Sequence, residues 1–157
     1  MHTVYRITKK TKLLTHADSN YYRSYIVEEE GEHYSVHRPE EIIGRNCLSY
    51  KASLEGRLDV VKGILKSSTK LPVPIFPEYG IFLMPTASIR NPSCVWIAYH
   101  QVHHYETYKK GTYIHFYDGT GYFVNITEAA FDKQYKRTSQ VIVHLNREKL
   151  FGYAESW

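Results

Sequence analysis

The histidines at positions 100, 103 and 104 are the first residues whose spacing suggests chemistry, because neighbouring imidazoles can bind a metal ion. In one extended strand, His100 and His104 would lie on one face and His103 on the other. Neither an HExxH helix nor a close trio of acidic residues accompanies them. The sequence therefore predicts no metal site, no cofactor and no enzyme activity. A metal-dependent nuclease built on these histidines ranks last among the alternatives.

The two cysteines, Cys47 and Cys94, lie far apart and form no CxxC pair, so they cannot supply the four ligands of a structural zinc site. Cys94 precedes the apolar run Val95, Trp96 and Ile97, and a thiol buried among such residues is inert. We expect two reduced cysteines that pack in the core. The motifs GxxxxGK[ST], GxGxxG and GxSxG do not occur, so no motif supports a nucleotide-binding or an α/β-hydrolase function.

The polar loop 86–93 lies between two apolar segments and combines small hydroxyl side chains with Arg90 and Asn91. Hydroxyls and an arginine suit contact with phosphate, and Arg or Asn can enter a narrow A·T-rich minor groove. Asn-Pro and Ser are also common turn formers, so on chemistry alone an ordinary surface turn is the favoured interpretation.

The charge of the chain is modest in total and uneven in distribution. The 157 residues carry a net charge of +4. Residues 45–70 contain six bases against Glu55 and Asp59; the bases are Arg45, Lys51, Arg57, Lys62, Lys66 and Lys70. Such segregation can create a positive face for nucleic acid, or it can reflect ordinary solvated helices. No apolar run is long enough for a membrane span and no export signal follows Met1, so we expect a cytoplasmic, nucleoid-associated protein without membrane contact.

Periodicity and turn signals predict an α+β fold with a mainly antiparallel sheet and two or three helices, in a single domain spanning 1–157. We expect a hairpin over 22–37, helices over 39–50 and 54–65, and a stiff extended connector over 69–80. Apolar strands are expected over 81–85 and 94–102. Segments 112–117 and 121–126 should form a second hairpin around Asp118-Gly119-Thr120, and Thr127 should cap a last helix.

One ordered set of residues carries a family resemblance. It contains Cys47, Gly56-Arg57, Lys70, Pro72, Pro77, Ile81-Phe82, Pro85-Thr86, Ser88, Cys94, Trp96-Ile97 and Val102. This order and spacing resemble the signature of the ComK family of competence transcription factors, and the likeness extends over roughly residues 30 to 138. The resemblance implies an activator of DNA-uptake genes that binds paired A·T-rich boxes through the minor groove, as homodimers that assemble further.

The partner expected from the resemblance is double-stranded DNA. The residues expected to contact it are Arg57, Arg90, Asn91, Lys62, Lys51 and Lys70. Arg57 and Lys70 coincide with signature positions, whereas the other four rest on charge and loop chemistry. A structural arginine that binds a carboxylate is the alternative for Arg57. We read Trp96, Phe82 and Ile97 as core residues.

Three departures from the family pattern leave a second hypothesis open. The chain has Lys51-Ala52-Ser53-Leu54 and Val73 where the family differs, which could mark a paralogue with altered DNA preference or reduced activity. The second hypothesis is a relative that does not bind DNA and instead titrates other regulators or the degradation adaptor. Family members commonly carry a longer tail recognised by the MecA adaptor, which delivers them to the ClpC protease. Segment 150–153 resembles that tail only loosely, which argues against control by this route.

Overall fold

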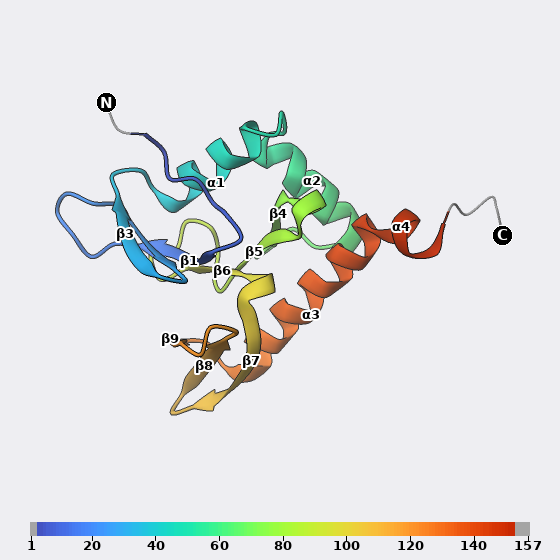
Figure 1. Ribbon diagram of the computed structural model, residues 1–157. Helices are drawn as coiled ribbons and strands as arrows, with labels where there is room; N and C mark the ends of the chain where they lie inside the picture. Colours follow the sequence, from blue (N-terminus) through green and yellow to red (C-terminus); the bar gives the residue numbers. More distant parts are fainter. Residues whose placement is uncertain (1–2, 153–157) are drawn as a thin grey trace.

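The computed structural model describes residues 3–152, and within them two antiparallel sheets are packed with four helices (Figure 1). The larger sheet has the strand order β3-β2-β1-β6-β5-β4, and the smaller sheet has the order β7-β8-β9. The larger sheet comprises β1 (Thr11–His16), β2 (Ser24–Glu28), β3 (Gly31–Ser35), β4 (Val73–Phe76), β5 (Ile81–Pro85) and β6 (Val95–Ala98). The smaller comprises β7 (Val102–Tyr108), β8 (Gly111–Phe116) and β9 (Gly121–Val124). The helices are α1 (Pro39–Leu48), α2 (Leu54–Leu65), α3 (Glu128–Leu145) and α4 (Arg147–Phe151), with 3-10 turns η1 (Pro77–Tyr79) and η2 (Tyr99–Gln101).

The predicted α+β class and antiparallel pairing are confirmed. The prediction of one sheet and two or three helices was too simple, because the described residues contain a second sheet and the short additional helix α4. Within the same residues, no helix combines the length and apolar character needed to cross a bilayer.

The helices begin where the local sequence predicts. Pro39 opens α1, and the Ser53 hydroxyl at the start of α2 accepts a hydrogen bond from the Gly56 N–H at 2.9 Å. Thr127 caps α3 by accepting from the Ala130 N–H at 3.1 Å. Each side chain satisfies a backbone donor that the first helical turn leaves unpaired. Both predicted hairpins are also confirmed, as β2–β3 and as β8–β9.

The expectation of an extended connector over 69–80 was wrong. Residues 73–76 form β4, which pairs with β5 through Val73 opposite Leu83 and Pro74 opposite Phe82. β4 is the last strand of its sheet and has only one partner, so the absent N–H of Pro74 can be tolerated there. The prolines therefore mark a sheet edge and not a linker.

The strand expected over 94–102 is interrupted. β6 ends at Ala98, η2 turns the chain, and β7 begins the smaller sheet at Val102. The basic N-terminal segment, for which no strand was expected, contains the central strand β1. Lys12 lies within β1 and is buried, with its Nζ 2.8 Å from Asp118 Oδ2 in the turn between β8 and β9.

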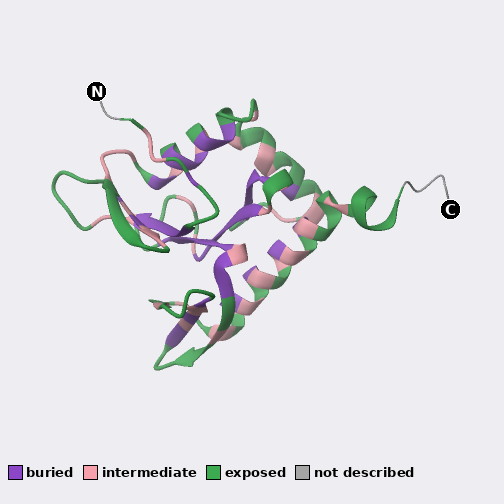
Figure 2. Ribbon diagram, in the orientation of Figure 1, coloured by how far each residue is buried: buried purple, intermediate pink, exposed green. Residues whose placement is uncertain are grey.

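The larger sheet is covered on both faces, and its alternating side chains separate two cores. Figure 2 colours its central strands β1, β6 and β5 as buried along most of their length. Leu14, Trp96 and Leu83 pack with α1 on one face. Their neighbours on the other face pack with the smaller sheet and α3; these neighbours include Leu13, Ile97 and Met84. A third cluster joins α2 to α3 through Val61, Phe82 and Val141. The predicted core residues Trp96, Phe82 and Ile97 are all buried.

Candidate nucleic-acid interface

The six residues predicted to contact DNA do not gather on one ridge. Lys51 lies in the loop before α2, Arg57 and Lys62 lie within α2, and Lys70 lies in the loop that leads to β4. Arg90 and Asn91 lie in the loop between β5 and β6. Most of these residues belong to two groups, one at each end of β4.

One group lies at the end of the larger sheet where β4 begins and β5 finishes. The Gln134 side-chain amide of α3 donates to the Lys70 carbonyl at 2.9 Å and to the Pro85 carbonyl at 2.7 Å. Arg137 donates to the carbonyls of Thr69 and Lys70 at 3.0 and 3.2 Å. These bonds tie loop 66–72 to α3 and to the last residue of β5, from which loop 86–93 departs. We refer to loops 66–72 and 86–93 as the paired loops.

The chemistry of the paired loops suits phosphate contact. Neither loop contains Asp or Glu, and Lys66, Lys70 and Arg90 are exposed on them. Hydroxyl side chains from Ser67, Ser68, Thr69, Ser88 and Ser93 accompany these cations. Arg137 is missing from the predicted set, and its bonds to two loop carbonyls assign it a structural role.

Two of the predicted residues are partly engaged within the protein. The Asn91 side-chain oxygen accepts from the Ser93 N–H at 2.8 Å, which favours the turn interpretation of this loop. Lys62 lies 3.9 Å from Asp59 on an exposed surface, where an ion pair is weak. Both side chains keep donors that can contact a ligand.

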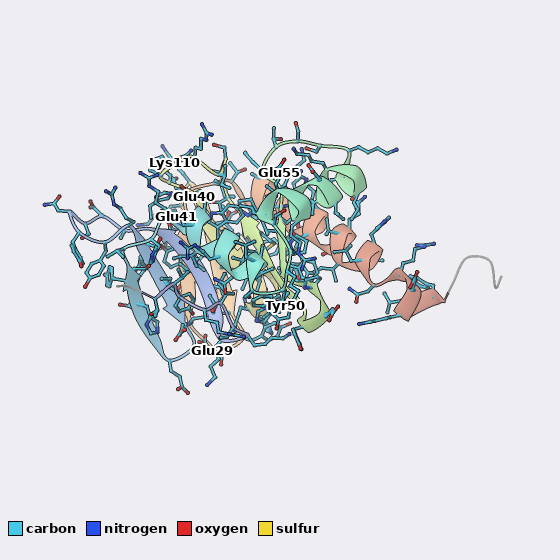
Figure 3. All side chains as sticks on the ribbon, turned by 90° about the horizontal axis from the view of Figure 1, so that it is seen from above. Glu29, Glu40, Glu41, Tyr50, Glu55 and Lys110 are labelled. Atoms are coloured by element: carbon cyan, nitrogen blue, oxygen red, sulfur yellow. The ribbon has the colours of Figure 1, made fainter. Side chains whose placement is uncertain are left out.

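Acidic side chains occupy part of the surface formed by α1 and α2. Figure 3 labels Glu40 and Glu41 in the first turn of α1 and Glu55 in the first turn of α2, where the helix dipoles favour them. Tyr50 lies well apart from all three in this view. These carboxylates would repel phosphate, so the surface at the first turns of α1 and α2 is unfavourable for contact with a duplex.

A second group surrounds Tyr50 at the end of the sheet where β4 finishes. The Tyr50 ring lies 4.1 Å from that of Phe76 and 5.9 Å from that of Tyr79. Arg57 lines a small cavity with these three aromatic residues. Tyr50 and Tyr79 remain 39% and 57% exposed, so their rings are available to a ligand.

Two further arginines, absent from the predicted contacts, adjoin this place. Arg6 and Arg45 are exposed and line one cavity of about 270 Å³ with Ser49, the residue before Tyr50. Partial burial and the neighbouring Tyr79 raise the pKa of Tyr50 against the opposing field of Arg6, so its hydroxyl remains a donor. The Tyr50 surface, as we name it, comprises Arg6, Arg45, Tyr50, Arg57 and Tyr79, with Lys51 as the residue that follows Tyr50. Its one acidic member among the described residues is Glu78, which lines the same cavity as Arg57.

Arg57 is half-buried and has no acidic partner. Among the described residues, no carboxylate lies within 4.0 Å of its guanidinium. Its Nε is buried and without a hydrogen-bond partner, and the side chain also borders a cavity of about 360 Å³ beside Lys149 of α4. The carboxylate-binding role considered for Arg57 therefore has no support within 3–152.

The histidines that suggested a metal site lie differently from the expectation. His100 belongs to η2 and its Nε2 is 2.7 Å from the Lys9 carbonyl, and burial lowers its pKa. His103 and His104 do not point to opposite faces, since their Nδ1 atoms lie 2.6 Å apart beside an irregularity in the β7–β8 register. The cysteines agree with prediction, because Cys47 and Cys94 are buried, unpaired and raised in pKa by that burial.

Comparison with known families decides the relationship. A family model described as "ComK protein" matches residues 2–149. The chain belongs to the ComK family. A ComK relative, the competence transcription factor of Bacillus subtilis (strain 168), is 31% identical over 117 residues, which is 74% of this chain. The matched region spans 61% of that relative's length. No solved structure matches the chain.

The ComK signature residues are mostly structural in this fold. Cys47, Phe82, Cys94 and Trp96 are buried, and the buried Thr86 hydroxyl accepts from the Val95 N–H at 2.9 Å. The exceptions include Lys70 and Ser88, which are exposed, and the half-buried Arg57. The signature therefore specifies the core first, and only a few of its members are accessible to a partner.

Proposed function

We propose that this ComK-family chain is a sequence-specific DNA-binding transcription factor for competence genes, acting in the cytoplasm at the nucleoid. The observation that carries the proposal is the convergence of Arg6, Arg45 and Arg57, from three separate segments, around the exposed rings of Tyr50 and Tyr79. Guanidinium groups attract phosphate and enter narrow minor grooves, and tyrosine hydroxyls donate to phosphate.

The paired loops provide a second contact in this proposal, through Lys70, Arg90 and Asn91, with Lys62 beside them on α2. β4 separates the two groups and has four residues, so they lie roughly 13 Å apart along the strand. One turn of duplex DNA spans about 34 Å. This spacing fits within one turn of a duplex, and we propose that one duplex contacts both the Tyr50 surface and the paired loops.

Backbone conformation gives independent support for functional lysines. Among residues 3–152, every non-glycine residue with positive φ is a lysine: Lys51, Lys66, Lys70 and Lys109. The left-handed conformation costs an L-residue about 1–2 kcal/mol, which glycine avoids. Lys51 and Lys70 adopt this conformation although each is a lysine. We infer that the positive charge of each side chain has a function that outweighs the conformational cost.

The target and assembly state belong to the same proposal. We propose paired A·T-rich boxes, whose narrow minor grooves carry enhanced negative potential, and a homodimer or higher homo-oligomer whose symmetry matches them. A MecA/ClpC-type adaptor is not included, because segment 150–153 resembles the recognised tail only loosely and its last residue lies outside the described residues.

Fluorescence anisotropy with a labelled duplex containing two A·T-rich boxes tests the proposal and divides the two groups. Arg45→Ala and Arg57→Ala should weaken binding and reduce the slope of log affinity against log salt by about 0.9 for each phosphate that the variant no longer neutralises. Arg90→Ala and Lys70→Ala should have smaller effects of the same kind. Lys110→Ala, an exposed lysine in the β7–β8 turn, is the matched control and should bind as the unmodified protein does.

Failure to retain the duplex at low salt would refute DNA binding. Co-purification of a regulatory protein would then favour the alternative, a family member that sequesters other regulators. Weaker binding in Arg90→Ala and Lys70→Ala, with Arg45→Ala and Arg57→Ala unaffected, would instead move the interface to the paired loops alone.

A further inference from the structure

The exposed face of the smaller sheet carries a group of potential metal ligands that lies apart from both candidate DNA contacts. His104 and Glu106 come from β7 and His115 comes from β8. One ligand atom from each residue lies within 4.8 Å of the other two. We call these three residues the His–Glu–His cluster.

Strand geometry explains why the three side chains meet. His104 and Glu106 are two residues apart on β7, so they share a face, and His104 lies directly opposite His115 in the register. The alternate residues Ile114 and Phe116 point into the core, and Tyr105 packs edge-on against Phe131 of α3. Because one face of the sheet is covered, the cluster is fixed on the face that solvent reaches.

The contacts within the cluster already direct nitrogen and oxygen atoms at one another. His115 Nε2 lies 2.5 Å from Glu106 Oε2, and the rings of His104 and His115 are stacked with centroids 4.2 Å apart. His103 joins them, because its Nδ1 lies 2.6 Å from that of His104. Two imidazole nitrogens at this distance share one proton, so one of them accepts it with its lone pair and could instead bind a cation.

We propose that the His–Glu–His cluster binds a divalent transition-metal ion of the zinc class. Two imidazoles and one carboxylate form a known protein ligand set for Zn²⁺, whereas Mg²⁺ and Ca²⁺ prefer oxygen ligands. Bonds of about 2.0–2.2 Å in a tetrahedral arrangement place ligand atoms roughly 3.4 Å apart. His115 and Glu106 must therefore separate by about 1 Å, and the ion would replace the proton between them.

The local backbone favours this rearrangement. His104 and Glu106 are exposed and His115 is half-buried, so their terminal torsions can turn until the lone pairs converge. The register shift between Val102 and His104 re-aims the neighbouring side chain, as β-bulges do. His103 is thereby brought beside His104, where it can occupy the fourth position or orient a water there. A bound ion would join β7 to β8 on the exposed side of the sheet.

Isothermal titration of Zn²⁺ into the full chain, purified without a polyhistidine tag, tests the proposal. One ion should bind per chain, and Co²⁺ in its place should give the visible absorption of a tetrahedral site. His104→Ala, His115→Ala and Glu106→Gln should each weaken binding at least tenfold. Glu106→Gln keeps a hydrogen-bond acceptor for His115 and so preserves the local structure. His144→Ala, an exposed histidine on α3, should bind Zn²⁺ as the unmodified protein does.

Two further measurements keep the result interpretable. Far-UV circular dichroism should show that every variant is folded, since the altered side chains lie at the surface. Lowering the pH to about 5 should weaken binding, because imidazole binds a metal only when unprotonated. Equal affinity in all variants, or no heat and no Co²⁺ absorption with the unmodified protein, would overturn the proposal. Neither outcome bears on DNA binding, which the cluster does not serve.

Discussion

The ion pair between Lys12 and Asp118 joins the two sheets, and its loss is the most informative perturbation of stability. Lys12 Nζ lies 2.8 Å from Asp118 Oδ2 and 2.8 Å from the Thr120 hydroxyl, and its side chain is only 4% exposed. Asp118→Asn keeps the shape and removes the charge. The Lys12 ammonium would then be buried without an anion, which is costly.

The pKa of Asp118 gives the magnitude. Burial alone would raise this pKa, but hydrogen bonds from Lys12 and Thr120 outweigh it and lower the pKa from 3.8 to about 2. Each pKa unit corresponds to about 1.4 kcal/mol. The Asp118 side chain is 21% exposed and the residue lies in an exposed turn, so solvent weakens the interaction. We therefore expect Asp118→Asn to lower the free energy of unfolding by about 1–2 kcal/mol.

The dependence on pH has a definite sign. The folded pKa lies below the unfolded value, so the carboxylate stabilises the fold fully above about pH 4. This stabilisation decreases as the pH falls toward about 2, where the folded state also takes up the proton. The difference between the protein and Asp118→Asn should therefore be constant near neutral pH and shrink in acid.

Urea denaturation followed by tryptophan fluorescence measures this difference at pH 7 and at a series of lower pH values. Asp59→Asn is the matched control, because Asp59 is 65% exposed and lies 3.9 Å from Lys62, and it should change stability by less than about 0.5 kcal/mol. A loss in Asp118→Asn no larger than in the control would refute the reasoning. So would a loss that stays the same as the pH falls from about 5 to about 2.5.

Buried groups elsewhere in the fold support three more predictions. Gln134→Leu removes the donor to the Pro85 carbonyl and one of the two donors to the Lys70 carbonyl, and it should cost about 2 kcal/mol in urea denaturation. Gln140→Leu, exposed on the same helix, should cost little. Cys47 and Cys94 should react with a thiol reagent only after denaturation, because burial raises the pKa of both; rapid reaction in the native state would contradict this. Gly121→Ala places a Cβ within 2.4 Å of the Tyr113 ring and should lower stability by about 1–3 kcal/mol, and Tyr113→Ala in the same chain should recover part of the loss.

The sequence predicts the elements whose ends are set by local contacts. Ser53 and Thr127 cap their helices through bonds to residues three positions away, so their effect is readable without the fold. β1 could not be predicted in the same way. Its Lys12 is a charged residue in a buried strand, and its burial depends on Asp118 and Thr120, more than one hundred residues later.

The candidate sites show the same limit. Arg57 and Lys51 were predicted from charge, but Arg6 and Arg45 join them only through the tertiary fold. His104 was considered with its sequence neighbours, whereas its ligand partner His115 lies on the adjacent strand. The register between two paired strands determines which side chains lie opposite each other. The sequence did not predict the turn η2 before β7, so this register could not be derived from it.

The margins of the larger sheet bear on how two copies of the chain could associate. β3 forms one margin, and it exposes Glu32 and His33 beside Glu28 of β2. β4 forms the other, where Pro74 has no N–H to offer. Charged side chains and proline both discourage the addition of a strand from another molecule. We therefore expect a dimer to use side-chain surfaces in place of the edges of this sheet. Single surface substitutions should then dissociate it while leaving the backbone pairing of each subunit intact.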